Sequence, residues 1–347
     1  MVLKNGLQVG LMVVFATSLT ACERLGNGSA DVVSQIKQKA IENLVFVDGG
    51  TFKLGDVGHP NGSPYVVLTD HARPTVEVSV DSYSISKYET TWGEMHVYYE
   101  KLGRFSLYEG SLYDKKFIAE PSQDPLSPYF YLKPARTPNY HEAEGYCAWL
   151  GDQTGLPFAL PTEAQWEFAA RSRGSNVPFA TNTGVADNDT YLQRPRQYID
   201  PSIPPSGNML SHSSLVMERR PVGSYPPNPI GLHDMSGNVA EWTQDWFQKD
   251  YYQHAPHNDP RGPLKPIDPD SPEKTVRDWA GHGDHVGGNA TVFARSGVPV
   301  SAGGNGFRCV VNHPKPIIDK LSHMNREVRL DAIYCSFFTH TFDSNSY

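Results

Sequence analysis

The stretch from Asn228 to Trp246 concentrates side chains that could hold a cation. Asp234 and Glu241 are seven residues apart, with a glycine-containing turn between them. Such a turn can direct two carboxylates and the intervening backbone carbonyls at one point, and Ca²⁺ takes about six to eight oxygen ligands of this mixed kind. The structural alternative is that Asp234 caps a turn and Glu241 pairs with an arginine.

The same stretch predicts a tight polar turn that runs into an aromatic core. Gly231 and Gly237 suit backbone positions with positive φ or close backbone approach. Trp242 and Trp246 are four residues apart, which places both on one face of a helical turn.

Two histidine pairs are the other candidates for metal chemistry, His254 with His257 and His282 with His285. A non-haem iron site needs two histidines and a carboxylate on one face. Both pairs lie in loop-like sequence, and 13 histidines produce such spacings by chance, so the sequence favours no catalytic iron site. It leaves open whether either pair binds a metal.

The first residues are typical of a secreted lipoprotein. Lys4 precedes the mostly apolar run Val9–Ala21, which is too short to span a bilayer and has the length of a signal-peptide core. The run ends in L-T-A-C and resembles a bacterial lipobox, so we expect lipidation of Cys22 and removal of the residues before it. Glu23 follows Cys22, which indicates the outer membrane. The alternative is a plain secretory signal with an incidental cysteine.

Three cysteines remain after Cys22, namely Cys147, Cys309 and Cys335. An odd number in an oxidising compartment leaves a free thiol or an intermolecular bond. Cys147 lies in a helical pattern, where we interpret it as a small buried hydrophobe. No C-x-x-C motif is present, which gives no support to a thiolate zinc site.

Composition indicates a loop-rich globular chain. The 30 glycines and 28 prolines point to many loops, and the net charge of −8 argues against nucleic acid, whose binding proteins carry basic patches. Periodicity predicts a strand with a turn or bulge at Leu44–Leu54, where a Gly-Gly pair occurs, and a strand at Val76–Ile85. It predicts helices over Glu89–Leu102, over Asn139–Gly151 and from Thr162, where Gln165 completes a capping box.

The predicted organisation has four parts. Residues 1–22 form the signal, residues 23–43 a tether with a short helix, residues 44–312 the main domain, and residues 313–347 an extension. The extension carries a helical pattern over Ile317–Arg329. Three segments without periodicity are expected to be loops: Gly103–Pro138, Asn176–Pro227 and Tyr251–Gly281.

Four ordered motifs resemble those of the formylglycine-generating enzyme family, also called the sulfatase-modifying factor family. They are V-D-G-G-T-F-K-L-G (47–55), L-P-T-E-A-Q-W-E-F-A-A-R (160–171), G-L-H-D-M-S-G-N-V-A-E-W-T (231–243) and G-F-R-C-V (306–310). The resemblance implies an α+β fold related to C-type lectins, rich in loops, with short antiparallel strands and few helices.

The family's oxidases bind copper(I) through a pair of cysteines, because Cu(I) requires soft thiolate ligands. The corresponding run here is Gly287–Gly297, in which Val292 and Gly297 occupy the approximate ligand positions. Neither residue can bind a metal. We therefore expect no copper and no oxidase activity.

The resemblance also refines the calcium hypothesis. It implies side-chain ligands from Asp234 and Glu241 and backbone oxygens from Gly237 and Val239. Asn208 and Met209 form a weaker second candidate site, since the matching downstream acidic ligand is missing.

Three functions remain open. The first is a non-catalytic periplasmic lipoprotein that binds a protein partner through its loops. The resemblance to lipid-anchored family members implies a type VI secretion immunity protein that neutralises a toxic effector. Its contact surface would lie in Gly103–Pro138, Asn176–Pro227 and Tyr251–His285. The expected anchors are Tyr129–Tyr131, Tyr251 and Tyr252, unless these side chains simply pack within the loops.

The second function is an oxidoreductase of the formylglycine-generating or non-haem iron branch. The third is a structural or regulatory envelope lipoprotein of a secretion system. Bound copper or iron would favour the second, and a stoichiometric envelope complex the third.

Overall fold

The computed structural model describes residues 29–66, 69–108, 118–184, 219–278 and 291–317. Several candidates from the sequence lie outside these ranges: Cys22, Asn208, Met209, His282, His285 and Cys335. The helix predicted over Ile317–Arg329 also lies outside, from residue 318 onward. The chain divides into two compact units, one of residues 43–317 and one of residues 1–42 and 318–347. In the latter unit the structure describes helix α2, Ser29–Glu42.

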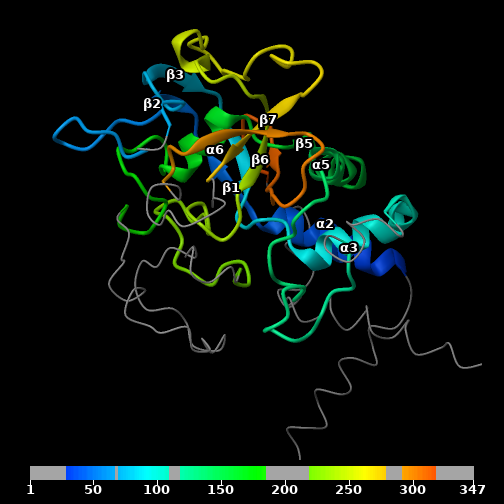
Figure 1. The fold of residues 1–347 in the computed structure, drawn as a ribbon. Helices are drawn as coiled ribbons and strands as arrows, with labels where there is room; N and C mark the ends of the chain where they lie inside the picture. Colours follow the sequence, from blue (N-terminus) through cyan, green and yellow to red (C-terminus); the bar gives the residue numbers. More distant parts are fainter. Residues whose placement is uncertain (1–28, 67–68, 109–117, 185–218, 279–290, 318–347) are drawn as a thin grey trace, which may run out of the picture. The chain divides into compact units, whose positions relative to one another are not determined.

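Short strands and few helices make up the described part of the 43–317 unit (Figure 1). The strands are β1 Leu44–Val47, β2 Gly50–Leu54, β3 Val76–Val80, β4 Tyr83–Ser86, β5 Phe158–Ala159, β6 Glu241–Trp246, β7 Glu273–Arg277, β8 Arg295–Pro299 and β9 Val310–Val311. The helices are α3 Trp92–Lys101, α5 Tyr140–Thr154 and α6 Glu163–Ala170, with 3₁₀ turns η1 Arg104–Leu107 and η2 Tyr251–Gln253.

The strands pair antiparallel in three sheets among the described residues. The first sheet has the order β1-β4-β9-β5 and so joins the beginning, the middle and the end of the 43–317 unit. The second sheet is the pair β2-β3, and the third has the order β6-β7-β8. Helix α6 contacts β2 and β3 as well as β6 and β7, so it lies between the second and third sheets (Figure 1).

The single strand predicted over Val76–Ile85 is two strands, β3 and β4, in different sheets. The chain turns at Asp81 and Ser82. The amide of Asp81 donates to Asp259 Oδ1 at 2.8 Å, and Ser82 Oγ accepts from the amide of Gly49 at 3.0 Å. Since one of these partners is 178 residues away, local alternation could not reveal the break.

The third sheet corrects two expectations. Trp242 and Trp246 lie on β6 and not on a helical turn, because residues four apart share a face in a strand as well as in a helix. β7 lies inside the segment Tyr251–Gly281, which was expected to be a loop because its sequence has no hydrophobic periodicity. Four of the five β7 residues are buried, including Lys274 and Arg277, so charged side chains conceal the strand.

The helix starts follow the predicted capping chemistry. Thr162 and Gln165 form a capping box at α6 with backbone contacts of 3.0 Å each, as the sequence predicts. Asn139 caps α5. This helix passes through Gly151 and ends at Gly155, whose φ of 70° suits glycine. The end predicted at Gly151 was wrong, because glycine at an interior position lowers helix stability without stopping the helix.

A disulfide joins Cys147 of α5 to Cys309, the residue before β9. The interpretation of Cys147 as an unpaired small hydrophobe was therefore wrong. Both side chains are at most 1% exposed. The bond links residues 162 positions apart and attaches α5 to the first sheet.

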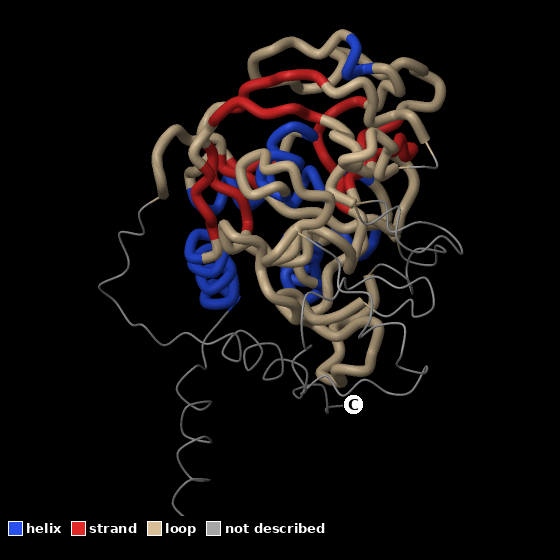
Figure 2. Tube along the Cα trace, turned by 90° about the vertical axis from the view of Figure 1, so that its left-hand side faces the viewer, coloured by secondary structure: helices blue, strands red, loops and turns tan. Residues whose placement is uncertain are grey.

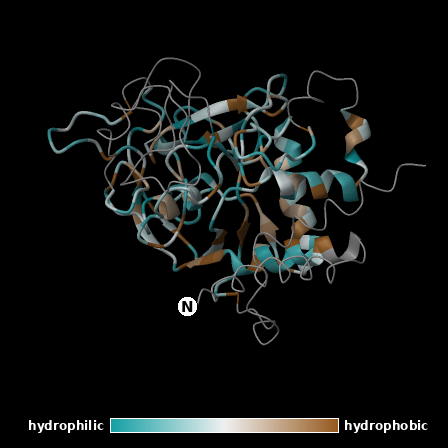
Figure 3. Ribbon diagram, turned by 90° about the horizontal axis from the view of Figure 1, so that it is seen from below, coloured by the Kyte–Doolittle hydropathy of each residue, from teal (hydrophilic) through white to brown (hydrophobic). Residues whose placement is uncertain are grey.

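The hydrophobic core surrounds α6. Trp166 and Phe168 are at most 1% exposed, and the ring of Phe168 lies 5.1 Å from that of Phe52 on β2. Loops form most of the chain path (Figure 2). Hydrophobic stretches follow strands and helix faces, whereas peripheral loops are mostly hydrophilic (Figure 3). No helix in the described ranges is long and apolar enough to cross a membrane.

Candidate functional site

The turn that precedes β6 has an unusual backbone. Gly231 and Gly237 have φ values of 92° and 111°, as the sequence predicts, and Asp234 and Asn238 also adopt positive φ, 57° and 61°. Aspartate and asparagine tolerate this region better than other non-glycine residues, because their short polar side chains can hydrogen-bond locally. The turn therefore coils tightly and directs its polar side chains inward.

Asp234 is buried at the centre of this turn, at 7% exposure. Its Oδ2 accepts a hydrogen bond from the amide of Gly223 at 2.7 Å, whereas its Oδ1 has no partner in the described structure. Burial raises the pKa of Asp234 to about 6, although the Gly223 amide and the charge of Arg308 favour the ionised form. A buried carboxylate oxygen without a partner is costly, which is typical of a site that receives a cation.

Two further buried carboxylates border this turn, and the sequence did not assign either of them to the calcium site. Glu89 Oε2 accepts from the side chain of Asn238 at 2.9 Å, and Asp278 accepts from the amide of Gly237. Glu89 Oε1 and Asp278 Oδ1 have no partner in the described structure. Burial raises the pKa of both carboxyls well above the usual range.

Glu241 is held differently. Both of its oxygens accept hydrogen bonds from Arg308, with contacts of 2.7 and 2.9 Å, and Oε2 also accepts from Trp166 Nε1 at 2.9 Å. The three side chains are fully buried. The arginine pair considered for Glu241 is thus present. A cation here would share this carboxylate with Arg308.

A cation therefore fits Asp234 better than Glu241. Gly237 and Val239 occupy the turn between them, so backbone oxygens are available in sequence where the hypothesis needs them. In the described ranges no group of three or more histidine, cysteine, aspartate or glutamate side chains converges as a metal site. Backbone carbonyls would consequently have to complete the coordination.

A second group of buried charges connects α6 with β7 and β8. Glu163 accepts from Arg277 at 2.7 Å, from Arg295 at 2.9 Å and from the Tyr252 hydroxyl at 2.9 Å. Arg277 also donates to Glu167 at 2.8 Å. Burial raises the pKa of Glu163, but the charges of Arg295 and Arg277 outweigh it and lower that pKa to about 2. The network fastens α6 to the third sheet.

The two positions that correspond to the oxidase thiols are filled by packing. Val292 is fully buried, and its carbonyl accepts from Arg277. A Cβ atom at Gly297 would lie 2.4 Å from the ring of Phe247 and 2.5 Å from Glu273 Oε2. A thiol pair at these positions would require its neighbours to move.

His254 and His257, the histidine pair within the described residues, do not point to a common site. His254 lies 3.9 Å from Asp250 and His257 lies 3.8 Å from Glu77, and all four side chains are at least half exposed. Each histidine therefore faces its own carboxylate at the surface. His282 and His285 lie outside the described residues, as do Asn208 and Met209.

A family model for the sulfatase-modifying factor enzyme 1-like domain matches residues 29–313. The chain belongs to this family. Its fold is the formylglycine-generating-enzyme-like fold, an α+β architecture of short antiparallel strands, few helices and many loops.

Similar proteins carry different names. The chain is 29% identical over 235 residues to the serine/threonine-protein kinase pkn1 of Chlamydia pneumoniae, a match of 66% of this chain and 32% of the kinase. It is 33% identical over 174 residues to the formylglycine-generating enzyme of Streptomyces coelicolor, a match of 49% of this chain and 50% of that enzyme. The chain thus spans a third to a half of these relatives.

The structure of PvdO from Pseudomonas aeruginosa is similar, with a TM-score of 0.55 at 24% identity. The similarity covers 77% of this chain and 93% of PvdO. It concerns the fold alone, since the same fold can carry unrelated functions.

Proposed function

We propose that this chain is a non-catalytic, lipid-anchored protein of the bacterial periplasm that binds a protein partner through its loops. We infer that the partner is a toxic effector of type VI secretion, which would make the chain an immunity protein. The observation that carries the non-catalytic part is the packing at Gly297, where Phe247 and Glu273 occupy the space that a thiol would need. Oxidase chemistry through copper(I) would need thiolates there.

The contact surface that we propose does not use Tyr251 and Tyr252, two of the anchors expected from the sequence. Tyr251 and Tyr252 are only 7% and 1% exposed, so packing within the loop explains them. In the same segment Leu264 is 99% exposed and Ile267 is 63% exposed. Two exposed aliphatic side chains in one proline-rich loop favour a docking surface, because binding a partner would remove them from water.

The proposed cellular location rests on Cys22 and on the disulfide. Disulfides persist in oxidising compartments and are rare in the cytosol, so the Cys147–Cys309 bond supports a periplasmic location. Lipidation of Cys22 would anchor the chain to the membrane, and Glu23 favours the outer membrane.

The first experiment combines capture of a partner with metal analysis. The full-length chain is solubilised in mild detergent, incubated with proteins secreted by competing bacteria, and analysed for stoichiometric partners and for calcium, copper and iron. We expect one secreted partner and no redox metal. Copper or iron at stoichiometric amounts would overturn the proposal and favour the oxidoreductase branch that the Streptomyces relative represents.

The docking loop is tested by a double substitution, Leu264→Asp with Ile267→Asp. Because each change places a charge in the interface, we expect binding of the captured partner to weaken at least about a hundredfold, while the melting temperature stays unchanged. Leu102→Asp is the matched control, since Leu102 is 49% exposed and lies outside the three loops expected to contact the partner. An equal loss in both variants would place the contact elsewhere.

We also propose that a structural Ca²⁺ binds at Asp234, with backbone oxygens of Gly237 and Val239 and a shared Glu241. The unpartnered Asp234 Oδ1 supports this proposal. A cation that binds only the folded state would add about 2.7 kcal/mol to the free energy of unfolding at a hundredfold excess over its Kd.

The calcium site is tested with Asp234→Ala in the full-length chain. A chelator should lower the melting temperature of the unmodified protein, and calcium should restore it. Asp234→Ala should lose that response. Asp152→Ala removes an exposed carboxylate on α5 and should keep the response. A chelator without effect on the unmodified protein would refute the site.

A further inference from the structure

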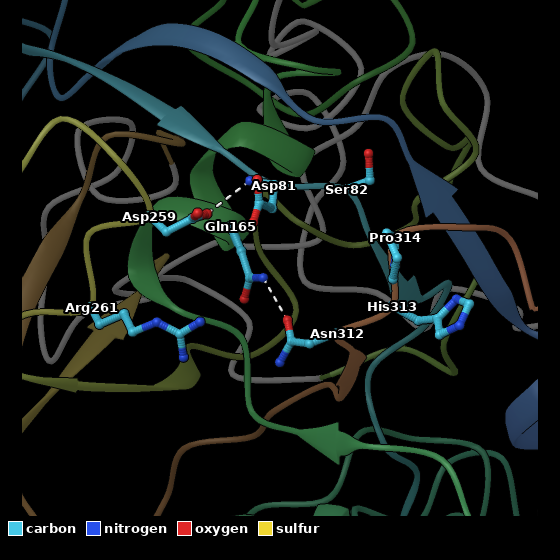
Figure 4. Close-up of a pocket in the computed structure, with 8 residues that line it drawn as sticks. All are labelled: Asp81, Ser82, Gln165, Asp259, Arg261, Asn312, His313 and Pro314. Atoms are coloured by element: carbon cyan, nitrogen blue, oxygen red, sulfur yellow. Dashed lines mark hydrogen bonds between the residues drawn. The ribbon is translucent and has the colours of Figure 1, made fainter.

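A polar pocket opens in the 43–317 unit where four segments meet. Its volume is about 380 Å³, within the usual range for small-molecule sites. The walls come from the turn between β3 and β4, the first turn of α6, the loop around residues 259–261 and the residues after β9. None of the metal or thiol positions discussed above lines it, and neither do Leu264 and Ile267, although Asp259 and Arg261 belong to the same loop as those two residues (Figure 4).

Hydrogen bonds within the chain hold the walls in place. Asp259 has a φ of 43°, donates its amide to Ser79 at 2.8 Å and accepts from the amide of Asp81 at 2.8 Å. Elsewhere in the lining, Gln165 Nε2 donates to Asn312 Oδ1 at 2.8 Å. Gln165 is only 6% exposed and is fixed by the α6 capping box. The pocket is therefore preformed, which reduces the entropy cost of binding.

The pocket contains opposite charges that do not neutralise each other. Across the described residues, neither the Arg261 guanidinium nor the Asp81 carboxylate has an ion-pair partner within 4.0 Å, and Asp259 Oδ2 has no hydrogen-bond partner. Figure 4 shows Asp81 and Asp259 together, while Arg261 extends toward the Gln165–Asn312 pair. The pocket thus has an acidic end and a basic end.

We propose that this pocket binds a small zwitterion, an α-amino acid or a short peptide with free ends. Asp81 and Asp259 receive the ammonium group. Arg261 and the side-chain amide of Asn312 donate to the carboxylate, since a guanidinium recognises a carboxylate through a planar pair of hydrogen bonds. No phenylalanine, tyrosine or tryptophan lines the pocket, and the one ring in the lining, the imidazole of His313, contacts the backbone of Lys315 through Nδ1. The lining therefore favours recognition by charge over stacking of a sugar or a nucleobase.

Binding is measured by ligand-observed NMR with the full-length chain and four probes: glycine, glycylglycine, N-acetylglycylglycine and glycylglycinamide. Glycine and glycylglycine separate a free amino acid from a peptide as the source of the zwitterion. Loss of either charge should weaken binding about tenfold or more, because each charge forms charge-assisted hydrogen bonds. Equal binding of all probes, or binding of none, would overturn the proposal.

A substitution in the lining tests whether the zwitterion binds in this pocket. Arg261→Gln should weaken binding of the better zwitterion about tenfold and leave binding of its carboxamide unchanged. Lys265→Gln removes a cation from the same loop outside the pocket and should have no effect. Equal losses in the two variants would mean general electrostatic attraction and would refute the site. This test is independent of any protein partner, so its failure leaves the proposed function unaffected.

Discussion

At the scale of single residues, the unusual feature of this protein is the number of fully buried carboxylates with different partners. Glu241 has an arginine on both oxygens, Glu163 has two arginines, and Asp245 has a backbone amide from Glu163 at 2.8 Å. A buried charge is stable only when it is paired and hydrogen-bonded. The partner therefore decides which carboxyl stays ionised near neutral pH.

Asp245 forms no ion pair among the described residues, and burial, followed by the charge of Glu163, raises its pKa from 3.8 to about 7 although the charges of Arg295 and Lys274 act against this shift. Between these two values the folded protein binds more protons than the unfolded chain. The contribution of Asp245 to stability is therefore present at low pH and declines as the pH rises from about 4 to about 7, with a slope of at most about 1.4 kcal/mol per pH unit.

We predict that Asp245→Asn removes this decline, because asparagine does not ionise and still accepts the Glu163 amide. Urea unfolding of both proteins from pH 4 to pH 7 measures the difference in the free energy of unfolding. As the pH rises, the free energy of unfolding of the variant should increase relative to that of the unmodified protein. Asp152→Asn controls for loss of a carboxyl group at an exposed position. A pH-independent difference for Asp245→Asn would contradict the prediction.

At the scale of elements, α6 is the part that the ion network and the core share. Its apolar residues Trp166 and Phe168 pack in the core, while Glu163 and Glu167 bind Arg277 of β7. Glu163 is only 2% exposed, so its ion pairs are shielded from water and salt. The network fixes where the third sheet attaches, and β8 carries Gly297 in that sheet.

We predict that Glu163→Gln lowers the free energy of unfolding by about 3–5 kcal/mol, because Arg277 and Arg295 would remain buried with too little negative charge. Chemical denaturation at neutral pH measures the loss. Glu77→Gln is the matched control, since Glu77 is 66% exposed and its ion pair is at the surface. That control should change stability by less than about 1 kcal/mol. If the two substitutions lower the free energy of unfolding by similar amounts, the buried ion pairs do not stabilise the attachment of α6 to the third sheet.

At the scale of the whole molecule, the 43–317 unit depends on contacts between segments far apart in the chain. The first sheet pairs β4 with β9, and the disulfide joins Cys147 to Cys309 across 162 positions. Long loops lie between these two contacts. Such a scaffold allows the loops to vary in sequence while the strand pairing and the disulfide are kept. A crosslink across so long a separation strongly restricts the unfolded chain.

We predict that the double variant Cys147→Ala with Cys309→Ala loses about 2–5 kcal/mol of stability. Thermal unfolding with and without a reductant measures this effect. The reductant should lower the melting temperature of the unmodified protein toward that of the variant and leave the variant unchanged. If the variant melts at the temperature of the oxidised protein, the bond does not contribute to stability.

Local patterns determined much of this protein. The capping box at Thr162 and the glycines of the 231–237 turn follow from rules that involve a few neighbouring residues, and the structure confirms them. The ordered motifs likewise indicated the family and its α+β fold, which the family match over residues 29–313 confirms. These features were readable because their physical causes lie within one or two turns of chain.

Only the tertiary structure decided the features whose causes are distant in sequence. The strand break at Asp81 depends on Asp259, and the state of Cys147 depends on Cys309. Strand β7 was not recognised because two of its buried residues, Lys274 and Arg277, are charged, and Arg277 pairs with α6. The pocket lined by Asp81 and Arg261 and the unpartnered oxygen of Glu89 also depend on residues that are distant in sequence. Burial and pairing across more than a hundred residues leave no local periodicity, so spacing alone could not reveal them.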